Sequence, residues 1–183
     1  PYVNGGLFAD ETIEIPQFTE KIRELLLVKA SEEFNWRDIS PTIFGAVFES
    51  TLNPETRRSG GMHYTSIENI HKVIDPLFLN NLEEEFNTLQ AYKTLDIKRK
   101  HLMDFQEKLV HLKFLDPACG SGNFLTETYL SLRRLENKVL RVLYGEGQGV
   151  LGIAASDIIK VSIQQFYGIE INDFAVTVAK TAL

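Results

Sequence analysis

The sequence predicts a helix-rich α/β fold, in which an N-terminal helical lobe precedes the first part of a parallel sheet. Apolar residues recur at helical spacing through most of the first 112 positions. A short apolar strand at 113–115 then runs into a glycine-containing loop at 116–123 and a helix at about 124–142. A second apolar run at 166–171 reads as a buried strand, and a helical segment follows at 174–183. Strand, glycine loop, helix and strand, in this order, are typical of an α/β unit with a parallel sheet.

Length and composition limit the possible functions before any motif is considered. The 183 residues include 19 Lys and Arg and 25 Asp and Glu, which gives a net charge of −6. This balance argues against a surface that grips the DNA backbone broadly, because such a surface needs clustered basic residues. The single cysteine, Cys119, excludes an internal disulfide and a four-cysteine zinc site. Because the chain begins at Pro1 and stops in an apolar stretch, we expect it to be part of a larger protein.

Residues 1–58 form the predicted helical lobe. Pro16 suits the first turn of a helix, because the N–H that proline lacks has no partner in that turn. The apolar positions of that helix are Phe18, Ile22, Leu25, Leu26 and Ala30. A second helix is predicted between Ser40, a good N-cap, and the pair Asn53-Pro54. The lobe is acidic, since residues 1–56 hold 10 acidic and 4 basic side chains.

Three further helices are predicted before the first strand. Ser66 is a suitable N-cap for a helix that runs to Ile74. Asp75 and Pro76 predict a new start, with Asp75 as the cap and Pro76 in the first turn. Apolar positions continue to residue 89 and again from 102 to 112. Residues 93–113 carry 6 basic and 3 acidic side chains, which we interpret as a solvated helix face.

The glycine loop carries the strongest chemical signal. Gly120 and Gly122 lack Cβ atoms, so a ligand can approach the backbone closely. The helix that follows offers free N–H groups and a positive dipole end to an anion. Asp116 ends the strand, where open α/β sheets bind ligands. A carboxylate beside an anion site suits a ligand with both an ammonium and a carboxylate, such as an amino acid moiety, better than a pyrophosphate.

Glu170 supplies a second signal at the end of the next strand. An acidic residue in this position typically binds the hydroxyls of a ribose. It lies 54 positions after Asp116, far beyond the roughly 20 expected in a dinucleotide-binding unit. The glycines also do not fit the dinucleotide fingerprint. Both observations argue against a nicotinamide or flavin cofactor.

Other candidate sites find less support in the sequence. Cys119 follows the strand closely, but no pattern supplies a base for a nucleophilic thiol, so we interpret it as a small packed residue. The four histidines show no zinc-binding spacing, and we predict no metal site. They are His63, His71, His101 and His111.

Three motifs together resemble one family. Residues 116–124, Asp-Pro-Ala-Cys-Gly-Ser-Gly-Asn-Phe, resemble the S-adenosylmethionine motif of amino-methylating DNA methyltransferases. Residues 61–66 resemble the companion motif of that group, and residues 168–172 resemble its ribose-binding strand end. The companion motif comes first, which is the γ order of adenine-N6 methyltransferases. Segments at 4–8, 43–49 and 57–58 further resemble the helical region of MmeI-like restriction-modification enzymes.

The resemblance implies S-adenosyl-L-methionine as cofactor and assigns roles to matching positions. In the companion motif, residues expected to close over the methionine carboxylate are Met62, His63, Tyr64 and Thr65. In the glycine loop, residues expected to line the methionine end are Asp116, Pro117, Ala118, Gly120, Gly122 and Asn123. Glu170 would bind the ribose and Ile171 would pack near the adenine. Residues 59–183 would then be the first part of a Rossmann-like class I methyltransferase domain.

The family's catalytic motif, Asn-Pro-Pro followed by an aromatic residue, does not occur in the sequence. Asn53-Pro54-Glu55 lacks the second proline and precedes the cofactor motif. We therefore expect no catalytic residue in this chain and no DNA methylation by the chain alone. The resemblance also implies a bacterial cytoplasmic protein, double-stranded DNA as partner, and contacts with target-recognition and possible nuclease domains of the same protein.

Two alternatives stay open at this point. A methyltransferase with the same cofactor could act on RNA or on a protein amide. The chain could also be a non-catalytic helical module that docks to neighbouring domains, with a loop that no longer binds cofactor. Binding of S-adenosylmethionine separates the second alternative from the others.

Overall fold

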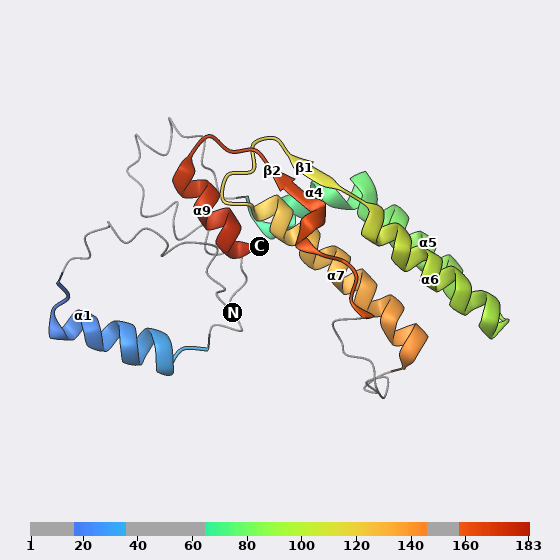
Figure 1. Ribbon diagram of the computed structural model, residues 1–183, viewed down its shortest axis with the longest axis horizontal. Coiled ribbons are helices and arrows are strands. Elements are labelled where there is room, and N and C mark those ends of the chain that lie inside the picture. The colour runs from blue at the N-terminus through green and yellow to red at the C-terminus, as the bar shows by residue number, and fades with distance from the viewer. Residues whose placement is uncertain (1–16, 36–64, 146–157) are drawn as a thin grey trace.

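The computed structural model describes residues 17–35, 65–145 and 158–183. Two parallel strands lie above a long helix, and a helical hairpin extends to one side (Figure 1). None of the helices described is long and apolar enough to cross a lipid bilayer. The elements are α1 (Glu20–Glu24), η1 (Leu25–Glu32), α4 (Ile67–Ile74), η3 (Asp75–Leu79), α5 (Asn80–Gln90), α6 (Leu95–His111), β1 (Phe114–Asp116), α7 (Asn123–Tyr144), η4 (Ile163–Gln165), β2 (Phe166–Gly168) and α9 (Asp173–Ala182).

The first predicted helix is present, but its apolar face is not buried. Thr19 caps it, its side chain accepting a hydrogen bond from the Ile22 N–H at 3.4 Å. Neither α1 nor η1 has a buried residue, and Leu25 and Leu26 are both about half exposed. Helical spacing predicts a helix correctly, whereas burial also needs a facing element, and the described residues provide none. Pro16, the predicted helix from Ser40 and the boundary at 58/59 lie outside the described residues.

A continuous helical rod runs from Ile67 to Gln90. Ser66 caps α4, with its side chain accepting from the Asn69 N–H, as the sequence predicts. The predicted new start at Asp75 is wrong: the backbone of Asp75 is helical, with φ −61° and ψ −58°, and η3 continues as a π-helical turn into α5. The wider turn avoids a break at Pro76, which lacks an N–H and would otherwise clash with the preceding turn. The Asp75 carboxylate bonds to His71 instead of acting as a cap.

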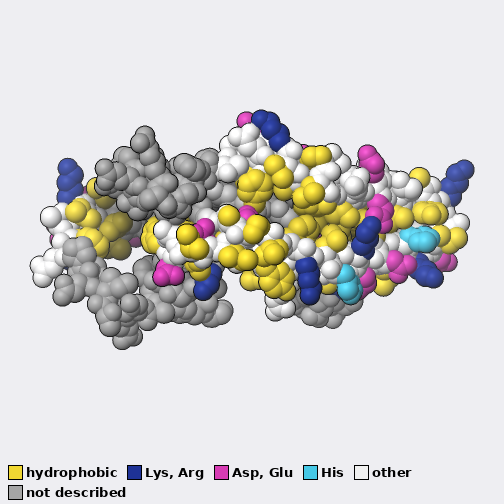
Figure 2. All heavy atoms as spheres, turned by 90° about the horizontal axis from the view of Figure 1, so that it is seen from above, with side chains coloured by type: hydrophobic (Ala, Val, Ile, Leu, Met, Phe, Trp, Pro, Cys, Tyr) yellow, Lys and Arg dark blue, Asp and Glu magenta, His cyan; other side chains and the backbone are white. Residues whose placement is uncertain are grey.

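The α5–α6 hairpin and α7 form the core. Most apolar positions predicted on the helices before β1 pack into one cluster, with Leu89 and Leu112 partly buried at its edge. The prediction is wrong for Leu77 on η3, which is 70% exposed. The largest share of this cluster comes from Leu82, Phe86, Leu102, Phe105, Leu109, Leu132, Leu135 and Val139. α7 contacts α4, α6 and both strands, so it is the central element of the chain. Charged side chains of both signs gather at the outer part of the hairpin (Figure 2).

The two strands pair in parallel, as predicted, with Phe114 opposite Phe166 and Asp116 opposite Gly168. The rings of Phe114 and Phe166 stack at 5.3 Å between centroids, on the α7 side of the sheet. The prediction of a buried strand at 166–171 is wrong in two respects. The observed strand, β2, ends at Gly168. Of the apolar residues in this range, Phe166 is buried, whereas Tyr167, Ile169 and Ile171 are exposed. Helices cover one face of this sheet in the described residues, so alternate side chains remain exposed.

Two buried polar side chains hold the chain in place before β2. The Gln165 amide nitrogen donates to the carbonyls of Leu109 and Leu112 at the end of α6, and its oxygen accepts from the Ser162 N–H. The Glu136 carboxylate, on α7, accepts from the backbone N–H groups of Lys160 and Val161. These bonds fix where β2 begins relative to α6 and α7.

Candidate functional site

The loop between β1 and α7 makes a tight turn at the end of the strand. One oxygen of Asp116, Oδ1, accepts from the Ala118 N–H at 3.0 Å. The Gly122 N–H donates to the Cys119 carbonyl at 2.8 Å. Gly122, with φ +81°, is the N-cap of α7. Asp116 ends β1, as the sequence predicts, and it lines one cavity together with Phe124 and Leu125 of the first turn of α7.

Glu170 connects the end of β2 to this loop. Its Oε2 accepts from the Gly120 N–H at 2.9 Å. Its Oε1 accepts from the N–H groups of Ile171 and Asn172, at 2.8 and 2.9 Å. Gly120 and Glu170, which are 50 residues apart in sequence, are thus joined directly, and Glu170 helps to hold the glycine loop. A carboxylate has about four acceptor positions, so it retains capacity for a further donor.

The two loop glycines have different surroundings. A Cβ atom on Gly122 would lie 3.0 Å from the Cβ of Ala179 in α9, so this glycine allows α9 to pack against the loop. A Cβ atom on Gly120 would have no heavy atom within 4 Å. Gly120 has φ +53°, a conformation that favours glycine. Open space beside a backbone without a side chain is what close approach of a ligand requires.

The start of α7 supplies hydrogen-bond donors. No side chain caps this helix. The first N–H groups of a helix have no carbonyl partner within it, and the dipole makes this end attractive to an anion. With the Asp116 carboxylate at its edge, the turn offers an anion site and a cation site next to each other. That arrangement complements the carboxylate and ammonium of an amino acid moiety and meets the requirement of the expected cofactor.

A cavity of about 240 Å³ lies between this turn and the rod. Its walls are mainly apolar and include Leu77, Phe78, Leu115 and Phe124, together with Asp116 and Pro117. Asp116 and Thr128 are the polar side chains among its lining residues.

Of the companion motif at 61–66, the structure describes Thr65 and Ser66, and Met62, His63 and Tyr64 lie outside the described residues. Thr65 is partly buried and directly precedes Ser66, the N-cap of α4. Since α4 packs on α7, the starts of both helices belong to one packed unit. Among the other predicted positions, Asn123 is buried, Pro117 and Ala118 are exposed, and Ile171 is 92% exposed.

Cys119 and Gly168 form a close contact that sequence analysis does not single out. A Cβ atom on Gly168 would lie only 2.6 Å from the Cys119 Sγ. Burial raises the pKa of the Cys119 thiol, and the Asp116 and Glu170 carboxylates raise it further. A thiol that stays protonated at neutral pH is a poor nucleophile, which supports a packing role. The interval from Cys119 to Gly168 gives no local pattern, so only the sheet register reveals the contact.

Replacing Gly168 with alanine is expected to destabilise the protein by about 2 kcal/mol, the usual cost of overpacking. Cys119→Ala removes the sulfur that the new methyl group would meet, so the double variant should recover part of that loss. Urea unfolding of the wild type, both single variants and the double variant gives the coupling energy. Equal effects of Gly168→Ala in both backgrounds would contradict the contact.

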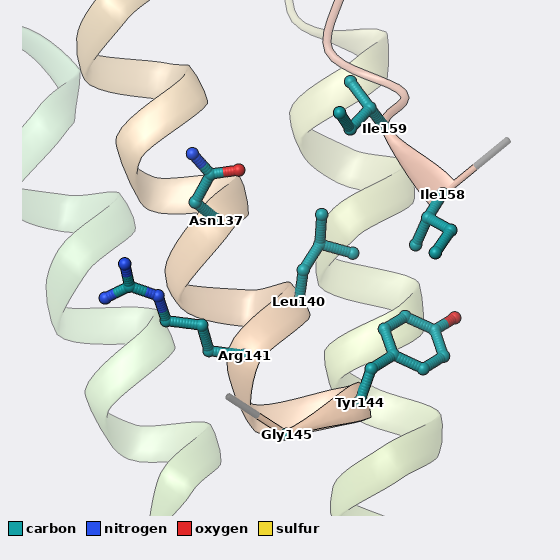
Figure 3. A pocket seen from close by; sticks show the side chains of 7 residues that line it. All are labelled: Asn137, Leu140, Arg141, Tyr144, Gly145, Ile158 and Ile159. Atoms are coloured by element: carbon teal, nitrogen blue, oxygen red, sulfur yellow. The ribbon is translucent and has the colours of Figure 1, made fainter. Parts of the chain in front are cut away.

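A second cavity, of about 230 Å³, lies at the opposite end of α7 (Figure 3). Leu140 and Tyr144 point towards Ile158 across it, whereas Arg141 lies on another side of the helix. A helix of 22 residues is roughly 33 Å long, so this cavity is remote from the glycine loop. The described residues also contain no group of three or more His, Cys, Asp or Glu that could hold a metal ion.

The chain is similar in sequence to DNA methyltransferases. Residues 91–183 match the family model described as "MmeI, DNA-methyltransferase domain". The whole chain is 44% identical to DNA methyltransferase A of Bacillus subtilis (strain 168) and covers 19% of it. It is 28% identical to a putative type II restriction enzyme and methyltransferase of Methanocaldococcus jannaschii, of which it covers 18%.

A solved structure is similar over the full chain. The structure of the Type IIL restriction-modification enzyme MmeI in complex with DNA matches with a TM-score of 0.80 and 45% sequence identity. The match covers 100% of this chain and 23% of that one. The chain thus spans about a fifth of the length of these relatives. The family match over half of the chain, on a glycine loop with the expected geometry, shows that the chain belongs to the MmeI DNA-methyltransferase domain family.

Proposed function

We propose that this chain is the S-adenosyl-L-methionine-binding part of a DNA adenine-N6 methyltransferase from a bacterial restriction-modification system. The observation that carries the proposal is the braced glycine loop, in which Asp116 lies beside the uncapped start of α7 and open space adjoins Gly120. Membership in the MmeI methyltransferase family supports a methyl donor of this kind.

The proposal gives separate tasks to the charged, polar and apolar groups of the site, and the loop residues Pro117, Ala118 and Gly122 line the methionine end. Asp116 binds the ammonium of the methionine moiety, and the first N–H groups of α7, from Asn123 onwards, bind its carboxylate. Glu170 holds the loop through the Gly120 N–H and offers its remaining acceptor capacity to the ribose hydroxyls. Ile171, which is fully accessible beside Glu170, covers one face of the adenine. The companion residues Met62, His63, Tyr64 and Thr65 close over the methionine carboxylate.

S-adenosylmethionine supplies an activated methyl group when bound. The chain's own residues bind and orient it, and positioning of this kind accounts for much of the rate enhancement in such transfers. The motif expected to hold the target amino group does not occur in this sequence, so we assign no catalytic residue here. Adenine N6 is proposed because the companion motif precedes the glycine loop in the sequence.

We further propose the arrangement of the whole protein. Residues 1–58 form a helical lobe and residues 59–183 the first part of the methyltransferase domain. Double-stranded DNA is bound with the help of other domains, because this chain is acidic, with a net charge of −6. We place the protein in the bacterial cytoplasm, where it would reach chromosomal DNA.

Methyl transfer to defined duplexes tests this function. The full-length protein with labelled S-adenosylmethionine is expected to produce N6-methyladenine in a duplex that carries its site. The 183-residue chain alone is expected to bind the cofactor and to transfer no methyl group. Methylation by the chain alone, or labelling of cytosine by the full-length protein, would contradict the proposal.

A further inference from the structure

A histidine of α4 bridges to a glutamate of α7, and each is the fifth residue of its helix. His71 Nδ1 lies 2.7 Å from Oδ1 of Asp75, one turn further along the rod. His71 Nε2 lies 3.2 Å from Oε1 of Glu127 on α7. The same Glu127 oxygen accepts from Arg134 at 2.8 Å. One imidazole ring thus contacts two carboxylates from two elements.

This geometry requires the charged form of His71. An ionised carboxylate accepts hydrogen bonds and donates none, so both ring nitrogens must carry hydrogen to satisfy both contacts. The Glu127 side chain is 2% exposed, and its two contacts, with His71 and Arg134, are to groups that can carry a positive charge. The pKa of His71 is raised, first by its hydrogen bond to Asp75, with burial opposing and Glu127 adding to the increase.

The bridge lies at the same depth in both helices. His71 is five residues after Ser66, the N-cap of α4, and Glu127 is five residues after Gly122, the N-cap of α7. Five residues of helix span roughly 7.5 Å. Ile70 and Ile74 are buried on α4 and contribute non-directional attraction, whereas the directional bond fixes how far one helix slides along the other.

We propose that protonated His71 is a positioning residue that fixes the start of α4, at Thr65 and Ser66, against the start of α7 and the glycine loop before it, so that cofactor affinity falls as His71 loses its proton. This inference rests on the proposed cofactor function. The charged groups that face His71 are Asp75 on its own rod and Glu127 and Arg134 on α7. His71, Asp75 and Arg134 line a further cavity of about 280 Å³. Glu83 of α5 and Lys138 of α7 line this cavity too, and they pair with each other at 2.7 Å.

The sign of the pH dependence follows from the raised pKa. A group with a raised pKa in the folded state stabilises the protein fully below its unfolded value, which is about 6.5 for histidine. That stabilisation is lost as the pH rises through the folded pKa. His71→Gln cannot carry a proton, so it should lack the pH-dependent contribution at every pH.

Calorimetric titration with S-adenosylmethionine, from about pH 6 to about pH 8.5, tests the inference. At the lowest pH, His71→Gln is expected to bind about fivefold more weakly than wild type, the effect of one net hydrogen bond. The difference should vanish at the highest pH. The ligand's own α-amino group titrates near about 7.7–8.0, but it affects all variants equally and cancels in the ratio of affinities. A ratio that is constant across the pH range would overturn the inference.

Two controls separate this inference from the proposed function. His101→Gln alters a histidine that stacks on Tyr92 in the hairpin, and it should keep the wild-type pH profile. Thermal unfolding without cofactor should show the same pH-dependent gap between wild type and His71→Gln. If wild type binds no cofactor, the proposed function fails, and the unfolding gap alone decides whether the bridge exists. An unfolding gap that is absent or independent of pH would overturn it.

Discussion

Replacing Glu136 with alanine is expected to lower the free energy of unfolding by about 4 kcal/mol, because one removed partner leaves a buried polar network unpaired. Glu136 is 0% exposed in the middle of α7. It accepts from Gln106 at 2.7 Å, from the Lys160 N–H at 2.7 Å and from the Val161 N–H at 3.2 Å, and it also pairs with Arg133. Alanine removes the acceptor of the Lys160 and Val161 N–H groups and one of the two acceptors of the Gln106 amide, and it opens a cavity.

Glu136→Gln provides the matched control, since it keeps the volume and one acceptor oxygen. It is expected to lose less stability than alanine, although its amide group would face donors. Urea unfolding at neutral pH measures both. Lys138→Ala, on an exposed turn of the same helix, should change stability by no more than about 0.5 kcal/mol. A loss below about 1 kcal/mol for Glu136→Ala would contradict the buried network.

Replacing Asp116 with alanine is expected to weaken S-adenosylmethionine binding by about tenfold to a hundredfold, the range for a hydrogen bond to a charged group. The substitution removes two things. One is the negative charge opposite the ligand's ammonium, and the other is the acceptor for the Ala118 N–H. Isothermal titration calorimetry measures the dissociation constant, and urea unfolding shows how much of the effect is structural.

Asp116→Asn separates these two losses. The asparagine oxygen still accepts from the Ala118 N–H, so the turn should keep its shape, whereas the negative charge is gone. We expect its affinity to be close to that of the alanine variant and its stability close to wild type. Wild-type affinity in Asp116→Asn would mean that the carboxylate charge does not contact the cofactor.

Local signals made much of the fold and the loop predictable. Ser66 lies directly before an apolar helical pattern, and its side chain caps α4 as expected. Within the turn from Asp116 to Gly122, two bonds join near neighbours: the Ala118 N–H donates to Asp116, and the Gly122 N–H donates to the Cys119 carbonyl. The residue types of the turn predict this local part of its shape. Glu136 lies in phase with Leu125, Leu132 and other buried residues of α7, so helical phase indicates its burial.

Other features depend on contacts that no local pattern encodes. Asp75 resembles a helix cap in sequence. In the structure its carboxylate contacts His71, one turn earlier, and the helix continues through a π-helical turn. Glu127 is buried because it faces α4, outside the main apolar stripe of α7. The bond between Glu170 and the Gly120 N–H requires the register of β1 and β2, which the sequence alone does not give.

The central claim is that the braced glycine loop binds the methionine end of S-adenosylmethionine. Amide resonances measured by heteronuclear NMR during titration with S-adenosylmethionine test it most directly. We predict saturable shifts for Gly120, Ser121, Asn123 and Ile171, and none for Ile158 and Ile159 at the far end of α7. Loop amides that stay unchanged at millimolar cofactor, or shifts confined to the far end of α7, would contradict binding at the glycine loop.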